Sequence, residues 1–373
     1  MFAAFPACHK KKKEVKKKTM TGYIGIDIGK KKCVTCLMDQ DGTILEQSSY
    51  PNTLLDASRF AKHALEKYDQ CKAVVESTGN MWLKTFEAFE SNGIEIKLSN
   101  PFKTRAIAEA KVKTDEVDSK VLAHLLRADL IAECYVPSGG VRQSRNLLGH
   151  KANLVRDETK IKNRIHSLLD KYDLECSYGN IFGVNGMVWL HNLKLDGDSD
   201  QLLLTSLLRQ IEFLRSEEEI AKQHIAGDAL DSNYVKIIMS MSGFDYYGAS
   251  LLAAYIADIK RFQSPEKIVS WAGLCPSVHQ SGESLYMGKM KDGNRKVKWI
   301  MIQAANSAAR HDPRMNAYYQ KKLKRHNHNV AITHVATKML KILWHMLYEN
   351  MLYNERNERL YNSKLNRMAK SAG

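Results

Sequence analysis

The pattern of hydrophobic and polar positions at the start of the chain predicts a β-hairpin followed by a third strand. Two apolar runs, Tyr23–Ile28 and Cys33–Met38, each have the length of a strand. Asp41-Gly42 is a typical tight-turn pair, and Thr43–Leu45 begins the next run. Asp27 falls inside the first apolar run. Because an isolated buried carboxylate is costly, we expect Asp27 to have a cation or a hydrogen-bonding partner, which is the first indication of a metal site.

The next part of the chain alternates between helical and strand patterns. Helical spacing over residues 54–68 and 82–91 alternates with short apolar runs at Lys72–Glu76 and Ile94–Leu98. Three strands followed by β-α-β-α-β segments are typical of an RNase H-like sheet rather than a doubly wound one. A polar run, residues 104–113, then leads into a predicted helix over residues 114–127 with acids in its first turn.

Two long polar helices are predicted after the first domain. Leu147, Leu154, Ile161 and Leu168 recur every seven residues, and a second periodic segment follows a Gly- and Asp-rich break at residues 179–200. Such heptads favour two helices that pair within the chain or with a partner chain. A helical hairpin with no role in dimerisation is the alternative.

The rest of the chain is predicted to be mostly helical. An irregular loop rich in Ser, Gly and Lys, residues 277–294, separates apolar helical segments. The predicted fold class is therefore α/β plus all-α. The expected divisions are a disordered basic tail (residues 1–20), an α/β domain (21–138), a coiled-coil helical region (139–229), a C-terminal helical domain (230–353) and a basic tail (354–373).

Composition and charge narrow the partners and the compartment. The formal net charge of +15 favours a polyanionic partner, nucleic acid first and an anionic membrane surface second. No apolar run approaches the roughly 20 residues of a membrane span, so no membrane partner is expected. Residues 1–20 are basic without an apolar segment, unlike a secretory signal, and Met20 is an alternative start.

The cysteines indicate a reducing compartment and no zinc site. The seven cysteines are scattered without a disulfide framework, which predicts a cytoplasmic protein. Cys33 and Cys36 form a C-x-x-C, but residues three apart in a strand point to opposite faces. With no second C-x-x-C, a structural role is favoured for both.

Four acids stand out by their positions. Asp27 lies in a strand, Glu76 at the end of a later strand, and Asp115 and Asp118 on one face of a helix start. Such carboxylates are able to bind two Mg²⁺ ions that bracket a scissile phosphate. Each acid also has a simpler interpretation: a turn-facing residue for Asp27, a solvated strand end for Glu76, and helix-dipole or capping roles for Asp115 and Asp118.

A second hypothesis concerns the segment Gly25–Gly29. Gly-Ile-Asp-Ile-Gly is similar to the first phosphate loop of actin-like ATPases and sugar kinases, a fold that also begins with a hairpin. Those proteins usually carry Ser or Thr soon after the second Gly, where this chain has Lys30–Lys32. The second Asp-x-Gly of that fold is also absent, apart from Asp196-Gly197-Asp198 in a predicted loop. This hypothesis is therefore the weaker one.

The ordered motifs resemble a known family. They are Gly25-Ile26-Asp27, Val75–Gly79, Lys113-Thr114-Asp115-x-x-Asp118-Ser119-Lys120, Ala272-Gly273-Leu274-x-Pro276, Ser281-Gly282 and Gly288-Lys289-x-Lys291-x-Gly293-Asn294. In this order they resemble the DEDD transposases of the insertion sequence 110 family, relatives of the Piv DNA invertase. The resemblance covers about residues 23–347.

The resemblance implies a RuvC-like RNase H-fold domain, a coiled-coil insertion and a C-terminal transposase domain. It maps four Mg²⁺ ligands onto Asp27, Glu76, Asp115 and Asp118. It also implies that Ser281 attacks DNA to give a covalent phosphoserine intermediate. The expected partners are donor and target DNA, a structured bridge RNA encoded by the element, and further copies of the chain, as a dimer and as a tetramer at synapsis.

Basic residues beside these motifs are candidates for nucleic-acid binding. One group precedes the helical acids and the other surrounds the serine loop: Lys103, Arg105, Lys111, Lys113, Lys289, Lys291, Arg295, Lys296 and Lys298. Solvated basic segments are the alternative. The function predicted is an RNA-guided DNA recombinase. Its rivals are a RuvC-like nuclease that uses water as the nucleophile, and a non-catalytic RNA-binding scaffold.

Overall fold

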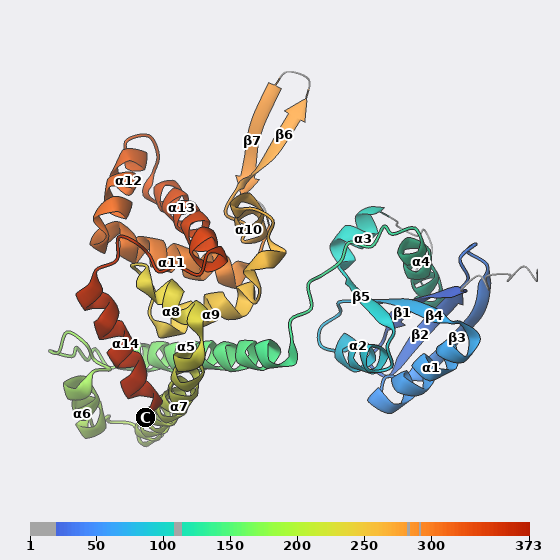
Figure 1. The fold of residues 1–373 in the computed structure, drawn as a ribbon. Coiled ribbons are helices and arrows are strands. Elements are labelled where there is room, and N and C mark those ends of the chain that lie inside the picture. Colours follow the sequence, from blue (N-terminus) through green and yellow to red (C-terminus); the bar gives the residue numbers. More distant parts are fainter. Residues whose placement is uncertain (1–19, 108–113, 282–283, 291) are drawn as a thin grey trace, which may run out of the picture. The chain divides into compact units, whose positions relative to one another are not determined.

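The computed structural model describes residues 20–107, 114–281, 284–290 and 292–373 (Figure 1). The chain forms two compact units, Met1–Val136 and Pro137–Gly373. The candidate residues Lys111, Lys113 and Lys291, and the predicted tail up to residue 19, lie outside the described residues.

The first unit is built on a five-stranded mixed sheet. Its strands are β1 (Thr21–Ile28), β2 (Lys32–Met38), β3 (Ile44–Pro51), β4 (Gln70–Glu76) and β5 (Glu95–Ser99). The order is β3-β2-β1-β4-β5, with antiparallel pairing among the first three strands of the chain and parallel pairing of β1 with β4 and of β4 with β5. This is the RNase H-like arrangement that the sequence predicts. The hairpin is confirmed, and the third strand extends further than expected.

Alternation along β1 assigns its two faces to different helices. Ile24, Ile26 and Ile28 are buried in a cluster with residues of α1 (Leu54–Lys67) and α2 (Trp82–Ser91). Tyr23 packs on the other face against α4 (Asp115–Arg127). Because side chains alternate in a strand, Gly25 and Asp27 share this α4 face.

A short helix, α3 (Pro101–Ile107), includes the start of the polar run at residues 104–113. Its start is fixed by Asn100, whose Oδ1 accepts hydrogen bonds from the backbone N–H groups of Phe102 and Lys103. Proline in the first turn is compatible with a helix because that N–H needs no intrahelical partner. Thr104 is buried, and its hydroxyl lies 2.7 Å from that of Ser99.

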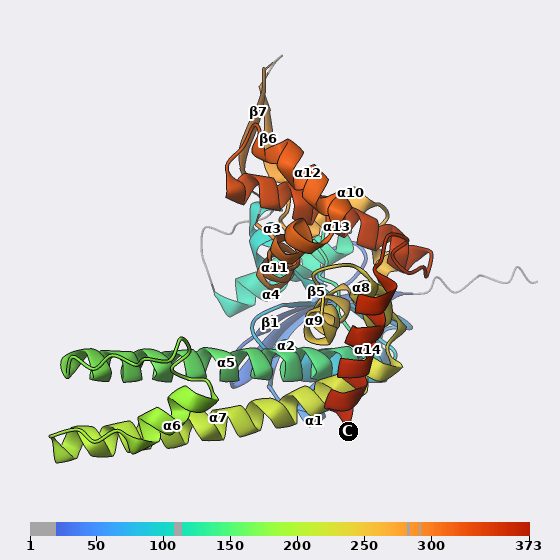
Figure 2. The ribbon, with the colours of Figure 1, turned by 90° about the vertical axis from the view of Figure 1, so that its left-hand side faces the viewer.

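Two long helices begin the second unit. α5 (Gly139–Lys171) and α7 (Asp198–Asp231) lie side by side and run in opposite directions (Figure 2). They share a cluster that includes Ile165 and Ile211. The Gly- and Asp-rich break between them contains a further short helix, α6 (Val184–Asn192).

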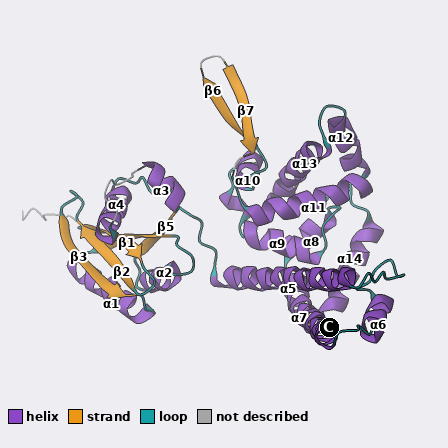
Figure 3. Ribbon diagram, turned by 180° about the vertical axis from the view of Figure 1, so that it is seen from behind, coloured by secondary structure: helices purple, strands orange, loops and turns teal. Residues whose placement is uncertain are grey.

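Helices dominate the remainder of the second unit (Figure 3). They pack around one large apolar cluster, and α13 contributes many of its buried side chains. The elements are α8 (Asn233–Ser240), α9 (Tyr246–Ile256), the 3₁₀ turn η1 (Ile259–Arg261), α10 (Pro265–Trp271), α11 (Arg295–His311), α12 (Pro313–Leu323), α13 (His328–Tyr348) and α14 (Glu358–Ala372).

The prediction of an irregular loop at residues 277–294 is wrong. This stretch contains an antiparallel hairpin of β6 (Pro276–Ser281) and β7 (Ser284–Met290), which projects from the helical body in Figure 1. The two strands pair with each other alone in their sheet. The sequence of this stretch lacks the clear hydrophobic alternation that predicts a strand, which is why it resembled a loop.

The end of the chain, residues 354–373, predicted as a basic tail or a frayed helix, is mainly helical. Its main part is α14, which lies against α7 and α8 (Figure 2). Tyr361, Lys364 and Met368 are buried at intervals of three and four residues. The Lys364 ammonium donates to the carbonyl oxygens of Met239, at 2.9 Å, and Met241, at 3.1 Å. A helix that buries so few side chains remains polar overall, which is why it resembled a tail.

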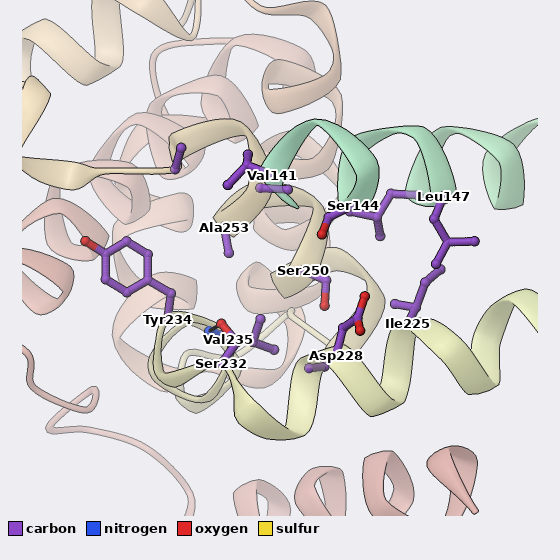
Figure 4. A pocket seen from close by; sticks show the side chains of 14 residues that line it. Val141, Ser144, Leu147, Ile225, Asp228, Ser232, Tyr234, Val235, Ser250 and Ala253 are labelled. Carbon is purple, nitrogen blue, oxygen red and sulfur yellow. Dashed lines mark hydrogen bonds between the residues drawn. The ribbon is translucent and has the colours of Figure 1, made fainter. Parts of the chain in front are cut away.

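A cavity of about 250 Å³ lies between α5, α7, α8 and α9 (Figure 4). Alanine and aliphatic side chains line most of it, together with Ser144, Asp228 and Ser250. The Ser250 hydroxyl is buried and has no hydrogen-bond partner among the described residues. The cavity belongs entirely to the second unit and contains none of the four candidate acids.

Candidate active site

Two parallel strands place the first two acids side by side. Ile26 of β1 is in register with Val75 of β4. Asp27 and Glu76 follow directly, so both stand at the carboxyl ends of neighbouring strands in the middle of the sheet. Both side chains are partly exposed. The carboxyl edge of parallel strands is the usual position of a site in an α/β sheet.

The first turn of α4 carries the other two acids. Thr114 caps this helix, because its hydroxyl accepts a hydrogen bond from the Val117 N–H at 3.2 Å. Asp115 and Asp118 follow in the first turn, where the positive end of the helix dipole stabilises negative charge. The cap therefore defines where both carboxylates begin on the helix.

A glycine allows α4 to approach the strand. A Cβ atom on Gly25 would lie 2.0 Å from the Ser119 carbonyl oxygen and 2.4 Å from the Ala123 nitrogen. These distances are far below van der Waals contact, so only glycine fits. Gly25 stands two residues before Asp27 on the same face of β1. The direct packing of α4 on Gly25 thus brings the helix start towards Asp27.

The electrostatics indicate that the four acids share one neighbourhood. The pKa of Asp27 is raised from 3.8 to about 6, chiefly by burial and then by the negative charges of Asp115, Asp118 and Glu76. A hydrogen bond from the Ile28 backbone opposes part of this rise. Among the described residues, no lysine or arginine forms an ion pair with any of the four. Their mutual repulsion is therefore not balanced by a described side chain.

The donor chemistry of this group fits a hard divalent cation. Carboxylate oxygens are the ligands that Mg²⁺ prefers, and a cation would relieve the repulsion that raises the pKa of Asp27. As the side chains stand, no three His, Cys, Asp or Glu residues in the described part of the chain are close enough together to hold a metal ion. The set thus matches the ion in chemistry, while its carboxylates are spread wider than a coordination shell.

The basic candidates are distributed over both units. Lys103 and Arg105 are exposed on α3, which follows β5 beside β4. Arg295, Lys296 and Lys298 form the first turn of α11, and Lys289 lies on β7. Lys103 and Arg105 therefore belong to the first unit, and Lys289, Arg295, Lys296 and Lys298 to the second.

Ser281 is the last residue of β6 and stands opposite Ser284 of β7. It therefore lies at the outer end of the hairpin, in the second unit, whereas the four acids lie in the first.

The two cysteines of the C-x-x-C, Cys33 and Cys36, are buried in separate clusters on opposite faces of the sheet, as the strand geometry predicts.

Two residues that position the acids, Gly25 and Ser119, belong to the sequence motifs, but their role in packing was not predicted from the sequence. Ser119 is fully buried, and its hydroxyl donates to the Glu116 carbonyl oxygen at 3.0 Å. The cap at Thr114 has a recognisable sequence signal, a threonine directly before an acidic first turn. The contact of Gly25 with α4 has none.

Comparison with known families identifies the chain. Residues 24–173 match the model of the DEDD transposases of IS110, described as a transposase, and residues 235–320 match the model described as "Transposase IS116/IS110/IS902 family". The chain belongs to the IS110 family of transposases. The first match contains all four acids and the second contains the β6–β7 hairpin. The family replaces the phosphate-loop interpretation of Gly25–Gly29, and it implies an enzyme that cuts and rejoins DNA.

Relatives of similar length support the family along most of the chain. The transposase for insertion sequence element IS1328 of Yersinia enterocolitica is 22% identical over 89% of this chain and 98% of its own length. The 43.6 kDa protein of insertion element IS110 of Streptomyces coelicolor is 21% identical over 90% and 96%. The 42 kDa protein of IS900 of Mycobacterium paratuberculosis is 31% identical over 32% and 31%.

RuvC of T. thermophilus in complex with a Holliday junction substrate aligns with 31% of this IS110-family chain and all of RuvC, at 10% identity and a TM-score of 0.24. In the part of the transposase that the structure describes, no helix has the length and apolar character needed to cross a membrane.

Proposed function

We propose that this IS110-family transposase breaks and rejoins DNA at the site formed by Asp27, Glu76, Asp115 and Asp118. The observation that carries the proposal is structural: the β1–β4 register sets Asp27 beside Glu76, and the capped start of α4, which carries Asp115 and Asp118, belongs to a helix packed directly on Gly25 of the same strand face. Four carboxylates kept together against their own repulsion contribute little to folding. Such a cluster is typical of a site that binds cations for phosphoryl transfer.

The four acids would hold Mg²⁺, as two ions shared among the four carboxylates. When bound, the ions would neutralise charge on the scissile phosphate, favour ionisation of the attacking hydroxyl and stabilise the leaving oxygen. Asp27 must lose its proton to act as a ligand. Glu76 is aligned with it by the parallel strand register. Asp115 and Asp118 are supplied by the capped start of α4.

Ser281 is the nucleophile of this proposal. Its Oγ atom forms a bond to phosphorus, the bond from phosphorus to the oxygen of the departing strand breaks, and the proton lost by the serine hydroxyl is balanced by the one that the departing oxygen takes up. The product is a DNA phosphodiester to Ser281, which a strand hydroxyl later attacks in the reverse sense. A position at the end of a projecting hairpin suits a residue that must reach DNA held elsewhere.

The same proposal includes a guide RNA and several copies of the chain. The net charge of +15 supports binding of both DNA and a bridge RNA, with base pairing selecting donor and target while Lys and Arg hold the backbones. The acids and Ser281 belong to different units, which is compatible with a composite site shared between subunits of a dimer or a synaptic tetramer. The enzyme would act in the cytoplasm, on the nucleoid.

A second function, a metal-dependent nuclease that uses water, is favoured by one observation. All four acids lie in the first unit, without Ser281. In that case, strand cleavage would need no serine and would leave free DNA ends.

The test is Mg²⁺-dependent cleavage of donor and target DNA in the presence of the element's flanking non-coding RNA. We expect Asp27→Asn and Asp115→Asn to lower the cleavage rate about a thousandfold or more, corresponding to the several kcal/mol that metal ions supply. Glu116→Gln is the matched control, because Glu116 is an exposed acid of the same helical turn outside the four. Equal loss in Glu116→Gln, or full activity in Asp115→Asn, would contradict the proposal.

A further inference from the structure

A second feature with side chains suited to nucleic-acid binding lies in the second unit, outside the β6–β7 hairpin. A groove of about 930 Å³ runs between α11 and α14, with the turn before α9 at its base. The side chains of α11 that line it recur every four residues along one ridge of the helix. They are Trp299, Gln303, Ser307 and His311.

The aromatic member of this ridge is exposed to an unusual degree. Trp299 leaves 52% of its surface accessible, whereas another face of α11 is buried against the core through Val297, Met301 and Ala304. Large aromatic side chains that remain exposed at a concave site are typical of recognition surfaces. A protein partner would require an apolar surround, whereas the neighbours of Trp299 along the ridge are polar.

The opposite wall contributes positive charge. Arg359 and Ser363, one turn apart on α14, line the groove, and Lys364 lies at its base. The Lys364 ammonium is held in place by the Met239 and Met241 carbonyl oxygens. Among the described residues that line the groove, the one carboxylate, Asp245, accepts a hydrogen bond from the Gly248 N–H at 2.7 Å. Arg295 and Lys296 begin the same helix that carries Trp299.

We propose that the groove between α11 and α14 binds a single strand of nucleic acid, with an unpaired base stacked on Trp299 and the backbone along Arg359. An indole face accepts any base, and flanking cations neutralise the phosphates, which is how sequence-tolerant single-strand sites work. Gln303 and Ser307 offer hydrogen bonds to base edges or phosphates. The wall formed by α14 lies beyond both family matches, which end at residues 173 and 320.

The test measures binding of a labelled single strand of about 16 nucleotides, in one arm DNA and in the other RNA, by fluorescence anisotropy in EDTA. We expect Trp299→Ala to weaken binding about five- to a hundredfold, the range that loss of one stacked base gives, and Trp299→Phe to restore most of it. Phe213→Ala is the matched control, because Phe213 is an exposed aromatic residue on α7. The arm with the larger effect identifies the strand.

A charge variant keeps the test decisive if a tryptophan variant fails to fold. Gln303→Glu adds a negative charge inside the groove, and Gln320→Glu adds the same charge on the exposed side of α12. We expect only Gln303→Glu to weaken binding. Equal affinities for the wild type, Trp299→Ala and Gln303→Glu would overturn the proposal, as would equal losses in the two controls.

This inference rests on the proposed function only in assuming that the chain binds nucleic acid. Because EDTA prevents cleavage, failure here leaves the acid-site test unaffected.

Discussion

Gly25 and Ser119 lie 94 residues apart in the chain, yet a Cβ atom on Gly25 would stand 2.0 Å from the Ser119 carbonyl oxygen. This contact seats the backbone of α4 directly on β1. It explains how a helix that follows the sheet in sequence delivers Asp115 and Asp118 to the strand that carries Asp27. The arrangement of the acids therefore depends on the absence of a side chain at one position.

We predict that Gly25→Ala displaces α4. The clash is with backbone atoms, which cannot rotate away, so the substitution should lower the free energy of unfolding by about 3 kcal/mol, the upper end for overpacked cores. DNA cleavage should be lost at temperatures where the protein remains folded. Thermal denaturation and the cleavage assay measure the two effects.

The control for this substitution is Gly227→Ala on α7, where an added Cβ meets nothing within 4 Å. Because alanine favours a helix over glycine by about 1 kcal/mol, this variant should be slightly more stable than the wild type. A fully active and equally stable Gly25→Ala would contradict the packing that we describe.

The raised pKa of Asp27 predicts a stability penalty that depends on pH. The folded value, about 6, lies above the unfolded value of 3.8. The folded protein therefore binds the Asp27 proton more tightly, and the associated stability is present below pH 3.8 and lost as the pH rises through 6. In EDTA, Asp27→Asn should have a higher melting temperature than the wild type at pH 7.5, and this advantage should shrink as the pH falls towards 4.

Divalent cations should reverse this order. Mg²⁺ should raise the melting temperature of the wild type at pH 7.5 because it binds only the folded site, and should change that of Asp27→Asn less. Glu116→Gln should follow the wild type under every condition. If the wild type in EDTA is more stable than Asp27→Asn at pH 7.5, the repulsion among the four acids is not what we infer.

The C-terminal helix is predicted to be part of the folded second unit. Lys364→Met removes two hydrogen bonds from a charged donor to the carbonyl oxygens of Met239 and Met241. Since bonds to charged groups contribute about 1.5–3 kcal/mol each at most, and the methionine still packs, we expect a net loss of about 2 kcal/mol in the free energy of unfolding. Denaturant titration measures it.

Asn362→Ala is the control for that substitution, because Asn362 is an exposed residue of the same helix. It should leave the unfolding midpoint almost unchanged. A freely mobile tail would make Lys364→Met equally silent, and that result would contradict the docked helix.

The first unit could be predicted almost completely from the sequence, whereas parts of the second could not. The strands that carry Asp27 and Glu76 are continuous apolar runs, and the Thr114 cap is a local signal. The sequence of the β6–β7 hairpin lacks a clear hydrophobic alternation, and α14 buries Tyr361, Lys364 and Met368 in an otherwise polar sequence, so both patterns resemble loops. The contact between Gly25 and Ser119 of α4 depends on the tertiary structure. The sequence around either residue does not indicate it.

The most direct test of the proposed mechanism is a denaturing gel that separates free DNA from DNA covalently linked to protein. The reaction contains the protein, its flanking RNA, donor and target DNA, and Mg²⁺. We predict a protein-linked DNA band for the wild type and for Ser284→Ala, the residue opposite Ser281 in the hairpin. The band should be absent from Ser281→Ala and from Asp115→Asn. Cleaved DNA without a linked band, at equal rates in the wild type and Ser281→Ala, would contradict the serine mechanism and identify water as the nucleophile.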